Sequence, residues 1–244
     1  MDATGAILRF QESWPYLAIL LFFALYPVVS SLVWISTSLM YYWRWERRND
    51  LEEAVLEEYP LVTVLVPVFC EQRVIARTIE GILEIDYPFK EIVVVDDAST
   101  DGTAVEIAPF VARGQVRLVR KRHNEGKAMA LNDALPLVNG EIVLIMDADA
   151  YPDPGILRWM VPHFQSARVA AVTGNPRVAN RQTLLAKLQL IEFASIVSLL
   201  RRAQRVWGRI LTMSGVVGAF RRSALIDVGL YSPEMATEDI EWAC

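Results

Sequence analysis

Apolar and polar residues follow two different patterns along the chain. No charged residue occurs from Ser13 to Trp43, whereas short apolar runs alternate with amphipathic stretches from Leu61 onward. About 20 apolar residues suffice to cross a bilayer of roughly 30 Å. The first region therefore predicts one tilted transmembrane helix, kinked at Pro27, and is too short for two spans. The second region predicts an α/β domain.

The elements of this domain follow from the same pattern. Apolar runs bounded by charged or turn residues predict buried strands at 61–67, 91–96, 116–120 and 141–146. Amphipathic stretches between them predict helices at 73–85, 103–111, 126–137 and 154–164. This alternation is typical of a mostly parallel sheet with helices on both faces. We therefore expect a transmembrane anchor at 1–45, a linker at 46–60 and an α/β domain at 61–244.

The flanks of the apolar run indicate its orientation. Arg44, Arg47 and Arg48 follow it directly, while the N-terminal flank has one arginine against two acids. The positive-inside rule then predicts an inner (cytoplasmic) membrane location, with the α/β domain in the cytoplasm and the lipid bilayer as a partner. A cleaved signal peptide is the alternative, but its basic n-region and small-residue cleavage site are missing.

The composition of the chain argues against a nucleic-acid partner and against a disulfide framework. The chain is 53% hydrophobic, has a formal net charge of -5 and a pI near 5.2. Nucleic-acid binders usually carry a basic face, so no nucleic-acid partner is expected. The two cysteines, Cys70 and Cys244, are far apart and in no metal-ligand spacing. A disulfide framework is therefore not expected, which fits a reduced environment for the α/β domain.

The segment from Arg181 to Val206 has two interpretations. Its apolar residues fall at roughly helical spacing and several arginines lie at its far end. The favoured interpretation is one long helix packed on the sheet. The alternative is an amphipathic helix that lies against the membrane.

Carboxylates follow two of the predicted strands. Asp147 and Asp149 come after the run 141–146, and Asp96 and Asp97 close the run 91–96. Side chains at i and i+2 of an extended backbone point the same way, and two such acids are costly to keep ionised without a cation. Mg²⁺ often takes one or two carboxylates together with substrate phosphates. Since open α/β sheets bind ligands at the carboxyl ends of their strands, we expect one site for a metal-bound nucleotide.

Other polar residues near these strand ends have structural alternatives. Ser99 and Asp101 could cap the next helix. The adjacent acids Asp96 and Asp97 are harder to explain by capping, and we interpret them as contacts to a uracil ring or ribose. Lys127 follows a glycine at a predicted helix start, where a lysine suits a phosphate. The surrounding run is not a P-loop, because it lacks the second glycine and the Lys-Ser/Thr end.

The residues Thr237-Glu238-Asp239 also permit two interpretations. They could cap a final helix, or they could present a carboxylate as a general base. The residues alone do not decide between these roles. A Rossmann dehydrogenase is excluded, because no Gly-x-Gly-x-x-Gly follows any predicted strand.

Five motifs occur in a characteristic order: Val66-Pro-Val-Phe-Cys-Glu71, Val95-Asp-Asp-Ala-Ser-Thr-Asp-Gly102, Gly126-Lys127, Asp147-Ala-Asp149 and Thr237-Glu-Asp239. From about Leu61 to the C-terminus, this order and spacing resemble the inverting family 2 glycosyltransferases of the GT-A fold. The runs 172–177 and 214–223 are most similar to the bacterial poly-β-1,6-N-acetyl-D-glucosamine synthases. Hyaluronan, chitin and cellulose synthases are less similar through these two runs.

The resemblance implies a membrane-anchored enzyme that transfers N-acetylglucosamine from a UDP-GlcNAc donor to a growing β-linked exopolysaccharide. Mg²⁺ or Mn²⁺ is the implied cofactor, and a small accessory membrane subunit is a possible further partner. The residues implied to bind the nucleotide sugar are Pro67, Glu71, Asp96, Asp97, Lys127 and Asp147. Asp149 and Asp147 are implied to hold the cation. Asp239 is the implied catalytic base, steadied by Glu238.

Two departures from the family pattern stand out. Cys70 occupies a place where the family usually has Asn, a change of little expected effect. The chain ends at Cys244, where family members continue with a Gln-x-x-Arg-Trp segment and further membrane helices. We interpret this as a C-terminal truncation. The alternative functions are another synthase of family 2 and a catalytically inactive fragment that binds a nucleotide sugar.

Overall fold

The computed structural model describes residues 13–48, 56, 58–178, 182–193, 198–208, 213, 215–229 and 231. Residue contacts divide the chain into two compact units. The first unit contains Met1–Asp50 and Ala194–Arg209, and the second contains Leu51–Phe193 and Ile210–Cys244. The proposed base Asp239 and its neighbour Glu238 lie outside the described residues.

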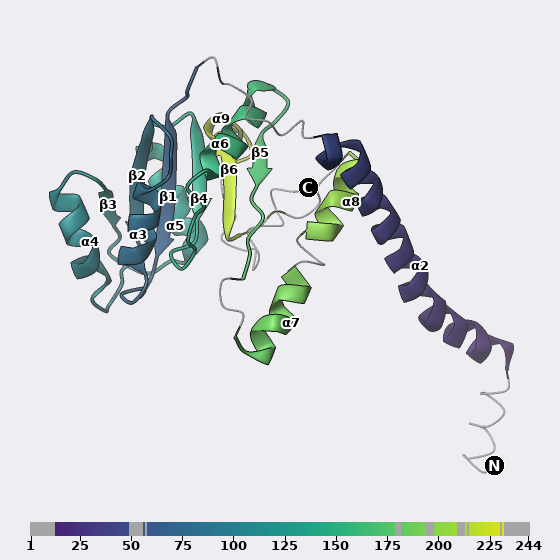
Figure 1. Cartoon of the computed structure of the whole chain (residues 1–244). Helices are drawn as coiled ribbons and strands as arrows, with labels where there is room; N and C mark the ends of the chain where they lie inside the picture. Colours follow the sequence, from purple (N-terminus) through teal and green to yellow (C-terminus); the bar gives the residue numbers. More distant parts are fainter. Residues whose placement is uncertain are drawn as a thin grey trace, which may run out of the picture. The chain divides into compact units, whose positions relative to one another are not determined.

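The first unit is built around one long apolar helix, α2 (Trp14–Arg44) (Figure 1). It has 31 residues, contains Pro27 within an unbroken helix, and has no buried residue. An 18-residue window of this helix has a mean hydropathy of 2.3, which together with the helix length makes it a candidate membrane span. A single turn of 3₁₀ helix, η1 (Glu46–Arg48), follows it. The expected apolar helix is therefore present, although a core helix or a signal sequence would have a similar composition.

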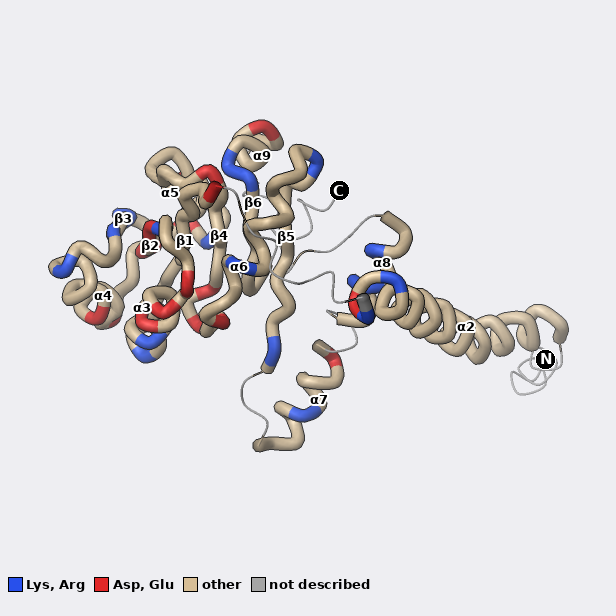
Figure 2. The backbone as a smooth tube through the Cα atoms, turned by 45° about the horizontal axis from the view of Figure 1, so that its top comes forward, with Lys and Arg blue, Asp and Glu red and all other residues tan. Residues whose placement is uncertain are grey.

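A short helix, α8 (Arg201–Val206), packs on the C-terminal part of α2 within the same unit. Ala203 is fully buried, and the Nε of Arg202 lies 2.7 Å from the Oε1 of Glu46. Figure 2 shows the basic residues that gather around α8 and this end of α2. Within the stretch 181–206, predicted as one helix, the structure assigns α7 (Leu184–Phe193) and α8 to different units, and residues 194–197 between them lie outside the described residues.

The second unit contains a six-stranded sheet whose strand order is β3-β2-β1-β4-β6-β5. The strands are β1 (Val62–Val68), β2 (Lys90–Asp96), β3 (Arg117–Arg120), β4 (Ile142–Met146), β5 (Ala171–Thr173) and β6 (Val217–Arg221). The first four are parallel, and β6 runs antiparallel to both β4 and β5. The predicted strands therefore formed as expected. The sequence pattern missed β5 and β6, because β5 is very short and β6 contains a glycine.

Helices cover both faces of this sheet (Figure 1). One face packs against α3 (Ile75–Leu83), α4 (Thr103–Ala112), α6 (Ile156–Met160) and η3 (Val161–Gln165). The other packs against α5 (Lys127–Ala134), η2 (Leu135–Leu137) and α9 (Arg222–Asp227). Each face of the sheet has its own hydrophobic core. Successive residues of β1 pack into the two cores alternately, so Val64 lies on one face and Leu65 on the other. The mixed, mostly parallel sheet with two helical layers confirms the expected fold class.

The apolar residues of α7 do not contribute to either core. Leu184, Leu185, Leu188 and Ile191 are each more than half exposed, while only Ala186 is buried. The interpretation that these leucines pack on the sheet is therefore wrong. The alternative interpretation, an amphipathic helix that lies against the membrane, stays a prediction.

Candidate active site

The acidic residues singled out in the sequence lie at one edge of the sheet. Because β1, β2 and β4 are parallel, their carboxyl ends meet there, and Val68 pairs in register with Asp96. Glu71 follows β1, Asp97 follows β2, and Asp147 follows β4. Ligands of open α/β sheets bind at such an edge, so these residues form the candidate site.

The carboxylates at this edge of the sheet lie close enough together to repel one another electrostatically. Burial raises the pKa of Glu71 above its ordinary value, and three neighbouring carboxylates raise it further. In order of effect, they belong to Asp149, Asp101 and Asp147. Like charges disfavour ionisation of one another, so a cation bound at this edge would relieve the repulsion.

Lys127 offsets part of this negative charge. It is the first residue of α5, and its Nζ lies 2.8 Å from the Oδ1 of Asp147. The same Nζ donates a hydrogen bond to the carbonyl oxygen of Gly215 at 3.2 Å. Lys127 thereby connects the end of β4 with the residues that precede β6. Asp147 is only partly exposed, whereas Asp149 is exposed to solvent and has no ion pair with any residue that the structure describes.

The loop that carries Asp149 is fastened to α3. The hydroxyl of Thr78 donates a buried hydrogen bond to the carbonyl oxygen of Ala148 at 2.6 Å. The hydroxyl of Tyr151 donates to the Oε2 of Glu84 at 3.0 Å. Gly81 makes room for the Tyr151 ring, since a Cβ at this position would lie 2.7 Å from a ring carbon. These contacts hold the loop in one conformation and present the Asp149 carboxylate to solvent.

Asp96 and Asp97 are buried and both bind neighbouring loops. The Oδ1 of Asp96 accepts the backbone N–H of Ser99 at 2.8 Å, and its Oδ2 lies 3.2 Å from the Nε of Arg120. Asp97 accepts the backbone N–H of Gly126 at 2.8 Å, directly before α5. Both carboxylates therefore have structural partners that the sequence pattern did not indicate.

A buried lysine accompanies Asp97. The Nζ of Lys121 lies 3.5 Å from Asp97, 2.8 Å from Glu125 and 3.0 Å from Asp133. Burial lowers the pKa of Lys121, but its hydrogen bonds to Glu125 and Asp133 outweigh burial and raise the pKa overall. No periodic or motif signal marks Lys121 in the sequence, so only the structure reveals it as part of this edge.

Replacing Asp97 with alanine is expected to lower the free energy of unfolding by about 3 kcal/mol or more. The variant leaves the N–H groups of Glu125 and Gly126 without their acceptor and removes one partner of buried Lys121. Urea unfolding measures the effect. Asp227→Ala, an exposed acid at the end of α9, is the control and should change stability by less than about 0.5 kcal/mol. Unchanged stability would overturn the structural role of Asp97 and leave nucleotide contact as its remaining expected role.

Two residues at this edge adopt the left-handed backbone region. The φ angle is 55° at Cys70, after β1, and 61° at Ala98, after β2. Side-chain contacts hold both loops, since the Cys70 N–H donates to the Oγ of Ser99 at 2.9 Å. Asn tolerates this region better than most residues, which gives a physical reason why an Asn suits the position of Cys70.

Two more of the expected site residues, Asp101 and Pro67, have structural roles, and the metal ligands remain to be considered. Asp101 accepts the backbone N–H of Thr103 directly before α4, although the N-cap residue of this helix is Gly102. Pro67 is buried within β1, where it pairs in register with Val95. Within the described part of the chain, no three His, Cys, Asp or Glu side chains converge as a metal cage. The donor set instead fits a hard cation that takes Asp149, and few other protein ligands, together with phosphate oxygens.

The fold is that of a GT-A glycosyltransferase. A mannosyltransferase from Pyrobaculum calidifontis, PcManGT, solved in complex with GDP-Man and Mn²⁺, superposes with a TM-score of 0.65 at 31% identity. The match covers 87% of this chain and 60% of that one. Staphylococcus aureus TarS 1-349 matches at a TM-score of 0.56 and 19% identity, over 75% of this chain and 53% of its own, which shows the fold alone.

Residues 63–229 match the glycosyl transferase family 2, and the chain belongs to this family. A poly-β-1,6-N-acetyl-D-glucosamine synthase of Staphylococcus epidermidis is 35% identical over 223 residues, which cover 90% of this chain and 54% of the relative. The synthase of the same name from Staphylococcus aureus strain COL is 34% identical over the same shares. The chain thus spans about half the length of the curated relatives that it matches.

Proposed function

We propose that this protein is a membrane-anchored inverting glycosyltransferase that moves N-acetylglucosamine from UDP-GlcNAc to a growing β-linked polysaccharide. One observation carries the proposal: an exposed carboxylate, Asp149, stands among mutually repelling acids at the carboxyl edge of a family 2 domain. The identity with poly-β-1,6-N-acetyl-D-glucosamine synthases supports the choice of sugar.

Asp149 is the proposed principal protein ligand of a Mg²⁺ or Mn²⁺ ion, with Asp147 beside it. A bound cation would supply Lewis-acid stabilisation of the negative charge on the departing diphosphate. Lys127, which already pairs with Asp147, adds a second positive charge at the same place. The acids and the lysine would thus bind and orient the donor at the strand ends.

Asp96 and Asp97 are the proposed contacts to the uridine, and Pro67 and Glu71 belong to the same nucleotide-sugar site. The hydrogen bonds that Asp96 and Asp97 accept set the positions of Ser99 and Gly126. A uridine would therefore bind beside loops whose conformations these two acids determine.

Asp239 is the proposed catalytic base, and Glu238 its neighbour in the same motif. A base removes the proton of the acceptor hydroxyl while its oxygen attacks the anomeric carbon and the bond to the departing UDP breaks. Attack from the face opposite to UDP inverts the configuration and converts an α-linked donor into a β-linked product.

The proposed location is the cytoplasmic membrane, with the family 2 domain in the cytoplasm. The apolar helix α2 supports an anchor, and the arginines that follow it support this orientation.

Calorimetry on the full 244-residue chain in detergent tests the proposal. We expect UDP-GlcNAc to bind in the presence of Mn²⁺, and EDTA to weaken binding severalfold or more, because the acids then lack a cation to bridge them to the diphosphate. Equal affinity with and without metal would defeat the metal assignment.

A second donor is suggested by the similarity to the mannosyltransferase, which was solved with GDP-Man. Repeating the titration with GDP-mannose shows which of the two candidate donors, UDP-GlcNAc or GDP-mannose, binds more tightly. We expect UDP-GlcNAc to bind at least about tenfold more tightly, a difference of about 1.4 kcal/mol. Tighter binding of GDP-mannose would overturn the proposed donor and leave the fold and the metal site intact.

A further inference from the structure

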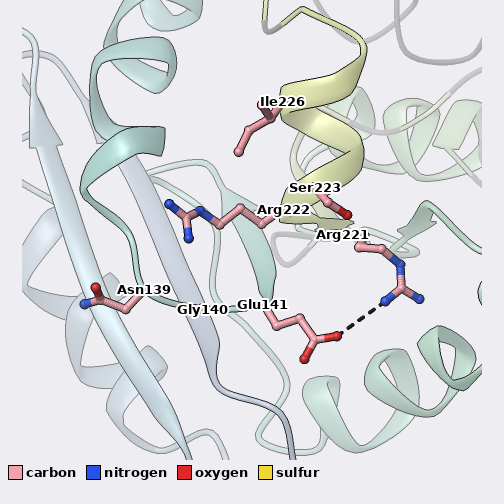
Figure 3. A pocket seen from close by; sticks show the side chains of 7 residues that line it. All are labelled: Asn139, Gly140, Glu141, Arg221, Arg222, Ser223 and Ile226. Carbon is pink, nitrogen blue, oxygen red and sulfur yellow. Dashed lines mark hydrogen bonds and ion pairs between the residues drawn. The ribbon is translucent and has the colours of Figure 1, made fainter.

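A separate pocket lies at the opposite edge of the sheet from the candidate active site (Figure 3). It has a volume of about 410 Å³ and is formed by residues 139–141, before β4, and by residues 221–223 and 226 at the end of β6 and in α9. This volume falls within the range of small-molecule sites, roughly 300–1,000 Å³. Because β4 runs from residues 142 to 146, the pocket and Asp147 are separated by the length of that strand.

Two consecutive arginines line this pocket, and the first of them has partners at both of its Nη atoms, although its Nε is buried without one. The Nη1 of Arg221 lies 3.4 Å from the Oε1 of Glu141, and its Nη2 donates to the carbonyl oxygen of Phe164 at 2.7 Å. The guanidinium also lies over the Phe164 ring, 5.7 Å from its centroid. Arg221 therefore holds the end of η3 and offsets the charge of Glu141.

Arg222 has no comparable partner. Its backbone N–H donates to the carbonyl oxygen of Glu141 at 2.9 Å, but its side chain extends away from Glu141 and toward the loop at Asn139 (Figure 3). Its Nε is buried without a hydrogen-bond partner, and no ion pair joins its guanidinium to any described residue. A buried N–H donor without a partner is costly, so this partly buried side chain would gain free energy from an anion that accepts the hydrogen of its Nε.

We propose that this pocket binds an oxyanion, carried by a phosphate or carboxylate group of a small molecule, with Arg222 as its principal ligand. The planar fork of an arginine matches the oxygens of either group bidentately. The lining contains two arginines against one acid, and that acid is paired with Arg221. Ser223, the next residue of α9, is exposed and also lines the pocket.

Phosphate binding to the full chain tests this site. Inorganic phosphate is titrated by calorimetry in EDTA, so that no divalent ion supports binding at the candidate active site. We expect Arg222→Gln to weaken phosphate binding by about tenfold or more, since a charge-assisted bidentate contact is lost. Arg113→Gln is the matched control, because Arg113 is an exposed arginine whose Nε donates to a carbonyl oxygen of its own helix. Its phosphate affinity should equal that of the unmutated chain.

A second probe distinguishes the two possible sources of the oxyanion. Acetate is titrated against the same variants, and the group that binds more tightly identifies the ligand class. Arg222→Lys keeps the charge and removes the fork, so it should bind either anion severalfold more weakly than the unmutated chain. Unchanged affinity in both Arg222 variants, or no binding of either anion at millimolar concentrations, would overturn the proposal. Neither result bears on UDP-GlcNAc binding at the other edge, so the two proposals fail separately.

Discussion

Asp149→Asn is expected to abolish the metal-dependent part of UDP-GlcNAc binding. Asp149 is exposed on a loop that Thr78 fastens to α3, and no described cation pairs with it. Asp147, by contrast, already pairs with Lys127 at 2.8 Å. The main anionic ligand for a hard cation is therefore Asp149, and an amide of the same shape supplies no charge.

The magnitude should be about tenfold or more in the affinity measured with Mn²⁺, and EDTA should have little further effect on the variant. Asp153→Asn is a matched control. Asp153 lies in the same loop and accepts the backbone N–H of Gly155 at 2.8 Å, a turn contact that Asn can also make. Retention of the Mn²⁺ effect in Asp149→Asn, with its loss in Asp147→Asn, would move the cation to Asp147.

Asp239→Asn is expected to abolish polymer formation in a complete synthase that carries residues 61–244, while UDP-GlcNAc affinity stays within a few-fold. The substitution keeps the size and the hydrogen-bonding capacity of the side chain and removes only its ability to accept the proton. Loss of a general base commonly lowers the rate by about 10²–10⁴-fold. Transfer from UDP-GlcNAc in membranes measures the rate, and calorimetry measures the affinity.

If Asp239 instead caps a helix, the expected result for Asp239→Asn is the opposite. Asn caps a helix almost as well as Asp does, so a capping residue would tolerate the change. Asp227→Asn, at an exposed site on α9, controls for general effects of removing a carboxylate. A rate close to that of the unmutated synthase would return Asp239 to capping and leave the chain without an identified base.

The sequence by itself determined the four parallel strands and the edge of the sheet at which the candidate site lies. Apolar runs such as 141–146 are local signals, and they correctly located β1, β2, β3 and β4. The acids that follow them could be assigned to one edge because parallel strands carry their carboxyl ends to the same side. The charge-free run at residues 13–43 likewise located α2 by its length and composition alone.

Only the tertiary structure decided which charges meet. Lys127 and Asp147 are 20 residues apart, and Asp97 and Gly126 are 29 apart, so no periodicity connects them. The antiparallel insertion of β6 beside β4 brings Arg221 and Arg222 to residues 139–141, which forms the pocket at the far edge. These partnerships depend on chain packing, because electrostatic contacts form between whichever side chains the fold brings together, whereas strand and helix patterns arise from neighbours in sequence.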